Sequence, residues 1–203
     1  AFNTAQAYIS AGFCRTVMVI GADSMSTLID WTDRGTCILF GDGAGAVILR
    51  AQEGNPVCMA AHSDGKKGPA LTQLSRHRKG WENEQNKESY IHMDGQGVFK
   101  FAVRKVPEII EEVLEKAELK LDDIDYFVLH QANRRIIEAA AKRLKVSMDR
   151  FPVNLEEYAN TSAATVPILL DELNRDGRFR EGQKIMLAGF GAGLTWAACL
   201  FEW

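Results

Sequence analysis

A short apolar run that leads straight into an amphipathic helix is the feature that most constrains the fold. The run Tyr126-Phe127-Val128-Leu129 predicts a buried strand that ends at His130. Residues 132–145 then place apolar side chains on one face, at the period of a helix. A strand followed by such a helix is typical of α/β folds, which usually hold their chemistry where a strand gives way to a helix. The sequence therefore predicts an α/β fold with His130 at a candidate site.

A second polar residue, Asn160, stands before another helical pattern over 161–174. An asparagine at such a place is most often a helix N-cap, a role that Thr161 could also fill. A single histidine is likewise more often structural than functional. Together, however, a neutral histidine and an asparagine that meet at one carbonyl oxygen would stabilise an enolate as it forms. His130 and Asn160 are therefore the candidate catalytic pair.

Two glycine-rich segments, 41–45 and 189–193, share the pattern Gly-x-Gly-Ala-Gly. Each stands between two runs that predict strands, which are 37–40 with 46–49 and 184–188 with 194–202. Neither segment leads into a helix, so we expect tight turning or close backbone packing rather than phosphate binding. At 189–193 an oxyanion-binding set of N–H groups is the competing hypothesis. The repeat indicates two related halves, and we predict a division into residues 1–54 and 55–203.

The other patterns are ordinary for a globular chain. Residues 16–21 are continuously apolar and predict a buried strand, whereas residues 62–92 are polar and predict an exposed excursion. The cysteines match no zinc or redox spacing, so we expect small buried hydrophobes and no metal site. They are Cys14, Cys37, Cys58 and Cys199.

Charge and hydropathy exclude some classes of partner. The net charge of −3 gives no reason to expect nucleic acid. No apolar run approaches the roughly 18 residues that a membrane-spanning helix needs, so we expect no membrane span and a cytoplasmic protein. Basic residues do cluster on the helix after His130, where a solvated face is the default interpretation. Beside the mouth of a site, the same residues would attract an acidic partner.

Five segments together resemble the β-ketoacyl-acyl-carrier-protein synthase III family. They include His130-Gln131-Ala132-Asn133 and Asn160-Thr161-Ser162, and in full they are 32–35, 40–46, 130–137, 160–167 and 190–196. The resemblance implies an α/β thiolase-like fold, with two pseudo-repeated α/β halves and stacked mixed sheets. It also implies that the first half is truncated in this chain.

The resemblance implies a decarboxylative Claisen condensation that initiates fatty-acid biosynthesis. An acyl group passes from coenzyme A to a cysteine, and malonyl-acyl carrier protein then loses CO₂ and attacks the acyl-cysteine. No cofactor is expected, because the coenzyme A thioester is a substrate. The expected partners are acyl-CoA and malonyl-acyl carrier protein, with a homodimer when the protein is intact.

By the same resemblance, His130 and Asn160 bind the malonyl thioester carbonyl. The segment Phe190, Gly191 and Ala192 contributes an oxyanion N–H and the wall where the carboxylate departs. Further expected roles are tunnel lining for Phe99, coenzyme A binding for Arg34, and carrier-protein docking for Lys100, Arg135, Lys142 and Arg143. A salt bridge within its loop is the alternative for Arg34.

The family's nucleophile motif, Ala-Cys-x-Gly-Phe, does not occur in this chain. Cys14 and Cys37 correspond to other positions of the family. We therefore expect a C-terminal portion that does not carry out acyl transfer by itself. Two alternatives stay open: a thiolase-fold acyltransferase of polyketide or secondary metabolism, and a non-catalytic module that binds carrier protein or coenzyme A. Acyl-donor profiling would separate the first alternative from the fatty-acid enzyme. Carrier-protein binding without turnover would favour the second alternative.

Overall fold

The computed structural model describes residues 1–53, 57–73 and 90–203. Its helices are α1 (Phe2–Ser10), α2 (Gly95–Lys116), α3 (Arg134–Leu144), α4 (Leu155–Tyr158) and α5 (Thr165–Arg175). Its strands are β1 (Thr16–Asp23), β2 (Gly43–Arg50), β3 (Cys58–Ser63), β4 (Leu71–Thr72), β5 (His92–Met93), β6 (Tyr126–Leu129), β7 (Lys184–Gly191) and β8 (Thr195–Glu202). Short 3₁₀ helices include η1 (Met25–Thr27), η2 (Gly65–Ala70) and η6 (Ser162–Ala164).

Two sheets form the frame of the molecule. One has the order β3-β8-β7-β6, in which β6 and β7 run parallel and the other pairs run antiparallel. The other consists of β1 and β2, paired antiparallel from Thr16 opposite Arg50 to Asp23 opposite Gly43. Strands β1 and β2 come before residue 54, and all strands of the four-stranded sheet come after it. This grouping is compatible with the predicted division into 1–54 and 55–203, which stays a prediction.

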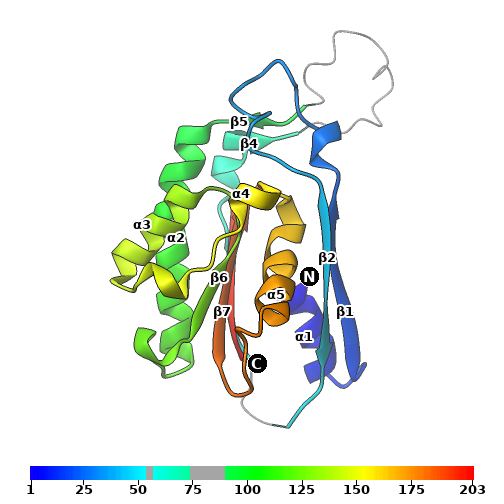
Figure 1. The fold of residues 1–203 in the computed structure, drawn as a ribbon, viewed down its shortest axis with the longest axis vertical. Helices are drawn as coiled ribbons and strands as arrows, with labels where there is room; N and C mark the ends of the chain where they lie inside the picture. The colour runs from blue at the N-terminus through cyan, green and yellow to red at the C-terminus, as the bar shows by residue number, and fades with distance from the viewer. Residues whose placement is uncertain (54–56, 74–89) are drawn as a thin grey trace.

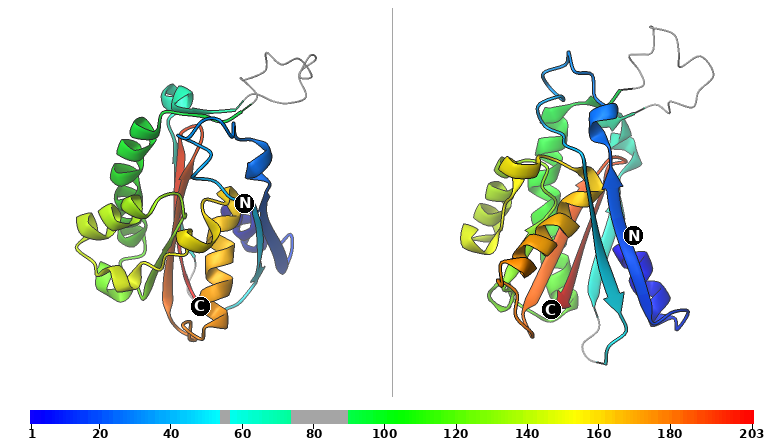
Figure 2. Two further views of the ribbon diagram at one scale, coloured as in Figure 1. Left: turned by 45° about the horizontal axis from the view of Figure 1, so that its top comes forward. Right: turned by 45° about the vertical axis from the view of Figure 1, so that its right-hand side comes forward.

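The sheets and helices alternate in layers (Figures 1 and 2). Helices α2 and α3 cover one face of the four-stranded sheet, and α5 packs on its other face. Strands β1 and β2 lie beyond α5, so this helix is enclosed between the two sheets. The predicted α/β architecture with stacked sheets is confirmed.

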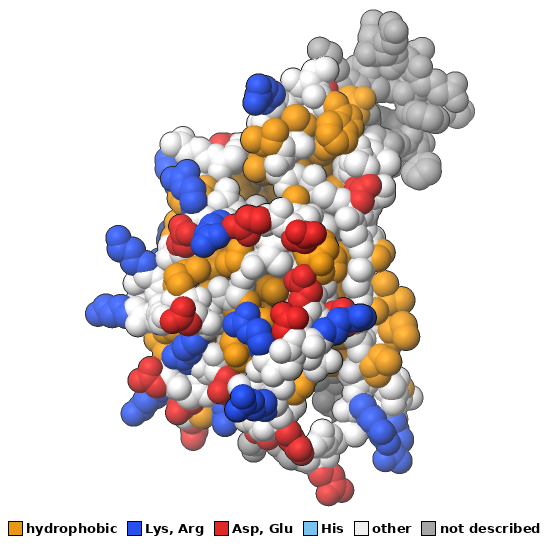
Figure 3. All heavy atoms as spheres, in the orientation of Figure 1, with side chains coloured by type: hydrophobic (Ala, Val, Ile, Leu, Met, Phe, Trp, Pro, Cys, Tyr) orange, Lys and Arg blue, Asp and Glu red, His pale blue; other side chains and the backbone are white. Residues whose placement is uncertain are grey.

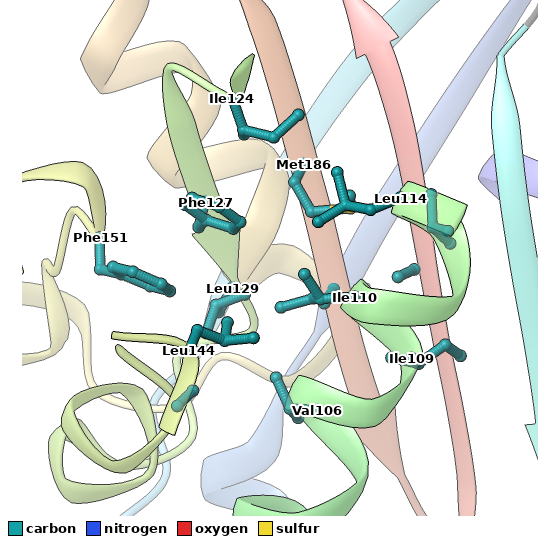
Figure 4. Packing of buried hydrophobic residues seen from close by; sticks show 14 of the residues in the cluster. Val106, Ile109, Ile110, Leu114, Ile124, Phe127, Leu129, Leu144, Phe151 and Met186 are labelled. Atoms are coloured by element: carbon teal, nitrogen blue, oxygen red, sulfur yellow. The ribbon is translucent and has the colours of Figure 1, made fainter. Parts of the chain in front are cut away.

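The main core fills the space between the four-stranded sheet and helices α2 and α3. Figure 4 shows side chains of these elements, including Val106, Ile110 and Leu129, directed toward one another. Phe127 of β6 stacks on Phe151, with ring centroids 4.7 Å apart. This packing holds the end of β6 rigid, and His130 is the next residue along the chain.

The predicted burial of the strand at 16–21 is wrong in part. Met18 and Ile20 are 59% and 62% exposed, and Ile48, which pairs with Met18, is 65% exposed. Burial alternates along both strands because only one face packs against α5 and the 162–164 turn. Figure 3 shows hydrophobic side chains along this margin of the molecule.

The predicted strand at 37–40 is also wrong. Phe40 forms only an isolated bridge to Asn160, and the chain from Gly43 onward is already β2. A Cβ on Gly43 would lie 2.9 Å from the Thr161 side chain, and one on Gly45 would lie 3.0 Å from Pro167. Of the two expectations for 41–45, close packing is therefore confirmed and tight turning is not.

Other predictions from the sequence are confirmed in part. At 189–193 the chain does turn from β7 into β8 as predicted. Cys199 is buried, which raises the pKa of its thiol to about 12, but Cys14, Cys37 and Cys58 are only half-buried. Of the predicted excursion over 62–92, residues 74–89 lie outside the described residues. None of the helices described is long and apolar enough to cross a membrane.

Candidate active site

His130 continues β6 by one residue beyond the strand. Its backbone N–H donates to the Ala188 carbonyl of β7 at 2.8 Å, which fixes the start of its side chain. The ring is held on two sides. Its Nδ1 lies 2.6 Å from the Thr165 hydroxyl, and its plane meets the Phe190 ring edge to face with centroids 5.4 Å apart. The imidazole therefore has a defined orientation at the junction of β6 and α3.

Asn160 is held through its backbone and its side-chain oxygen. Its N–H donates to the Leu39 carbonyl and its carbonyl accepts from the Gly41 N–H, both at 3.0 Å. Its Oδ1 accepts a hydrogen bond from the Ser162 N–H at 2.9 Å. This bond assigns the amide, because only the oxygen can accept from a backbone N–H. The Nδ2 group makes no hydrogen bond to any residue described, and it is left to act as a donor.

The prediction that Asn160 or Thr161 caps the following helix is wrong. The N-cap of α5 is Ala164, which makes no side-chain hydrogen bond, because the turn η6 intervenes between Asn160 and α5. Ala159 and Ser162, on either side of Asn160, have positive φ values of 57° and 52°. Such a conformation costs on the order of 1 kcal/mol or more for a non-glycine residue. These two residues flank Asn160 and belong to the turn that positions its backbone.

A pocket of about 1430 Å³ joins the two candidate residues. His130, Asn160, Phe99, Phe190, Gly191 and Ala192, all singled out from the sequence, contribute to its lining. So do Lys100 and Arg135, and the Arg135 guanidinium lies over the Phe99 ring, 5.2 Å from its centroid. The structure thus brings most of the predicted site together in one cavity.

Other predicted residues lie away from this cavity. Arg34 is exposed and does not line the pocket, although its neighbour Gly35 does. Lys142 and Arg143 are exposed on α3, and Arg143 pairs with Glu108 of α2 at 3.5 Å. Across the described ranges, no cluster of three or more His, Cys, Asp or Glu side chains could hold a metal ion.

Several lining residues could not have been singled out from the sequence. Met25, Leu28 and Ile91 form an apolar wall that is assembled from separate loops. Thr165 also lines the pocket, and only its contact with His130 distinguishes it from an ordinary first residue of a helix. These residues carry no local pattern, because their positions depend on tertiary packing.

Desolvation lowers the pKa of His130 from 6.5 to about 4. The ring is therefore neutral at physiological pH and carries a single proton. A neutral imidazole has one ring nitrogen that can donate a hydrogen bond and one that can accept.

The same pKa shift predicts how stability depends on pH. The unfolded histidine takes up a proton near pH 6.5, but the folded one does so only near pH 4. Between these values the unfolded state binds more protons, so lowering the pH through this window should reduce the free energy of unfolding by up to about 3 kcal/mol. Urea denaturation of wild type and His130→Gln at pH 7 and pH 4.5 measures the effect. The glutamine variant should lack this contribution, and an identical loss in both proteins would contradict the assignment.

The chain is similar to proteins of one family along most of its length. Residues 1–65 match the model described as 3-oxoacyl-[acyl-carrier-protein (ACP)] synthase III, and residues 114–203 match the model of its C-terminal part. The β-ketoacyl-[acyl-carrier-protein] synthase III of Clostridium acetobutylicum is 44% identical over the whole chain, which covers 63% of that protein. That of Acaryochloris marina is 46% identical over 98% of the chain and 62% of the relative.

Solved structures agree with these matches. The 3-oxoacyl-[acyl-carrier-protein] synthase III of Aquifex aeolicus superimposes with a TM-score of 0.91 at 38% identity, covering all of this chain and 63% of that one. The priming β-ketosynthase of the R1128 polyketide pathway superimposes with a TM-score of 0.92 at 33% identity, covering 99% of this chain and 61% of that one. The chain thus spans less than two thirds of the length of these relatives.

Proposed function

Because the chain belongs to the 3-oxoacyl-[acyl-carrier-protein] synthase III family and has its thiolase-like fold, we propose that it serves a decarboxylative Claisen condensation. In this reaction an acyl-CoA starter is joined to malonyl-acyl carrier protein, which initiates fatty-acid biosynthesis. The observation that carries the proposal is the pair of donors, His130 and Asn160, in the lining of one desolvated pocket.

The chemistry follows from where negative charge develops. When the malonyl thioester loses CO₂, the electrons of the broken C–C bond move onto the thioester carbonyl, which becomes an enolate. Hydrogen bonds from Asn160 Nδ2 and from the His130 ring stabilise that oxygen as its charge grows, and the desolvation at His130 strengthens the bond from its ring. The enolate carbon then attacks the acyl-cysteine thioester, and the cysteine leaves as a thiolate.

The rest of the pocket provides places for the remaining parts of the substrates. The wall of Met25, Leu28 and Ile91 is apolar and suits an acyl chain. One backbone N–H of the 190–192 segment, which lines the pocket, is the proposed donor to the oxygen of the acyl-cysteine.

Cations in the lining of the pocket and on α3 are the last part of the proposal. Lys100 and Arg135 border the pocket, and with Lys142 and Arg143 they offer positive charge to an acidic carrier protein. Arg34 is the proposed contact for the coenzyme A nucleotide. We also propose that the protein forms a homodimer and is located in the cytoplasm.

Release of CO₂ from malonyl-acyl carrier protein tests the proposal most directly. The protein should convert the malonyl thioester to the acetyl thioester, as measured by labelled CO₂ and by the mass of the carrier protein. The matched control is the double variant His130→Ala/Asn160→Ala, which should be inactive because both donors are gone. Equal release by wild type and double variant would refute the role of the pair. Intact mass after incubation with acetyl-CoA tests the acyl-transfer step separately.

Priming of polyketide synthesis is the second candidate, and the superposition on the R1128 priming β-ketosynthase favours it. The two candidates share the donor pair and differ in the starter that they accept. Profiling a series of acyl-CoA donors separates them. Carrier-protein binding without any release of CO₂ would instead support a binding module.

A further inference from the structure

Thr165, the first residue of α5, lies directly behind the His130 ring. It is 2% exposed, so its hydroxyl group must find its partners inside the protein. Its Oγ1 lies 2.6 Å from His130 Nδ1 and 3.1 Å from the Ser162 carbonyl oxygen. The two contacts compete, because a hydroxyl has one hydrogen to donate.

The Ser162 carbonyl does not depend on that hydrogen. It already accepts the backbone N–H of Thr165, which closes the turn η6. His130 Nδ1, by contrast, has no other partner in the described part of the chain. Nδ1 can accept the Thr165 hydroxyl hydrogen, or it can carry the ring proton and donate to Oγ1 while the hydroxyl donates to the Ser162 carbonyl. The proposed function requires a donor on the other ring nitrogen, Nε2, and this requirement selects the first arrangement.

We propose that Thr165 is a positioning residue that donates its hydroxyl hydrogen to His130 Nδ1 and thereby keeps the ring proton on Nε2. Nε2 is then the donor that His130 offers in the pocket. The contact itself stands on the geometry, whereas the direction of the hydrogen bond and its catalytic consequence rest on the proposed function.

The ring is neutral because of its burial, so it has one proton and two possible tautomers. Only the Nε2–H tautomer can donate to a substrate oxygen while Nδ1 accepts from Thr165. With the proton on Nδ1, the ring would present a lone pair to the enolate and would repel it. The tautomer therefore decides whether His130 helps or hinders the reaction.

Ser162, three residues before Thr165, also orients the Asn160 side chain. The Ser162 N–H occupies the acceptor Oδ1 of Asn160, and the Thr165 hydroxyl occupies the acceptor Nδ1 of His130. Both acceptors are thus engaged from one side, which leaves only donors for the substrate. Ser162 and Thr165 thus together set which atoms of the pair are left as donors.

NMR of the ring nitrogens tests the proposal directly. Two-bond proton–nitrogen correlations at neutral pH should show the His130 proton on Nε2 in wild type. Thr165→Val keeps the shape of the side chain and removes the hydroxyl, so its spectrum should report a mixture of tautomers. Its rate of malonyl decarboxylation should fall at least about tenfold. Thr165→Ser keeps the hydroxyl and should restore both the spectrum and the rate.

The chain contains a matched control in Thr161. Its side chain is fully buried, and its hydroxyl has no hydrogen-bond partner among the residues described. Thr161→Val therefore removes an equivalent buried hydroxyl, and it should leave the His130 spectrum and the rate unchanged. Thr165→Ala replaces Thr165→Val if the valine variant does not fold.

Two results would overturn the proposal. One is a wild-type ring with its proton on Nδ1. The other is a Thr165→Val protein with the wild-type spectrum and rate. If instead the spectra change as expected but even wild type releases no CO₂, the hydrogen bond stands and the proposed function fails. The two ideas are therefore tested separately.

Discussion

Replacing Asn160 with alanine is expected to lower the rate of malonyl decarboxylation by about 10²- to 10³-fold, the usual effect of losing one oxyanion donor. The Nδ2 group is fixed before substrate arrives, because the Oδ1 atom of the same amide is held by the Ser162 N–H. The rate falls because water that replaces the lost amide would have to be ordered during the reaction. The measurement is the initial rate of CO₂ release from malonyl-acyl carrier protein.

Asn160→Asp separates the loss of the donor from damage to the fold. The carboxylate can still accept from the Ser162 N–H, but it offers no hydrogen and repels the enolate. Its activity should be at or below that of the alanine variant. Asn174→Ala, on the exposed far end of α5, is the control and should keep the wild-type rate. A wild-type rate for Asn160→Asp would exclude the proposed role.

Gly21→Ala is expected to destabilise the fold by about 3 kcal/mol or more and to abolish decarboxylation. A Cβ on Gly21 would lie 2.3 Å from the Ala163 carbonyl oxygen and 2.6 Å from its carbon. Both obstacles are backbone atoms, so no side-chain rotation can relieve the clash. Strand β1 would have to move away from the segment 160–165. This segment contains Asn160 and contacts the His130 ring through Thr165. Urea denaturation and the rate of CO₂ release measure the two effects.

Gly65→Ala provides the comparison for this variant. A Cβ on Gly65 would have nothing within 4 Å, and the residue does not have a positive φ. Its stability should change by less than about 0.5 kcal/mol, and its activity should be unchanged. Equal stability of Gly21→Ala and Gly65→Ala would show that β1 and the segment 160–165 are not packed as described.

The elements that the sequence predicted well are those with a clear period and a local partner. Strand β6 was expected over 126–129 and is found there, and α3 falls inside the predicted 132–145. The start of α3 is local as well, since the Asn133 side chain accepts from the Arg135 N–H. The residues of the site within these patterns could be found for the same reason.

The errors occur where tertiary contacts decide the outcome. The apolar run of β1 predicted burial on both faces, yet only the face toward α5 and η6 is covered. The run at 37–40 has strand-like composition, but its strand-type pairing is limited to the isolated bridge between Phe40 and Asn160. The importance of Thr165 and Gly21 arises from single contacts to distant residues, which leave no trace in the local pattern.

The way in which the Asn160 amide is held has a consequence for inhibitor chemistry. Its oxygen is already satisfied and its nitrogen is free, so this point of the pocket calls for an acceptor. A neutral compound that places a carbonyl or sulfonyl oxygen there gains a hydrogen bond whose protein partner is already ordered. A group that can only donate, such as an ammonium, would face the amide hydrogens at the same point and leave both groups without a partner. A screen against this pocket can therefore be restricted to scaffolds with an acceptor at one defined position.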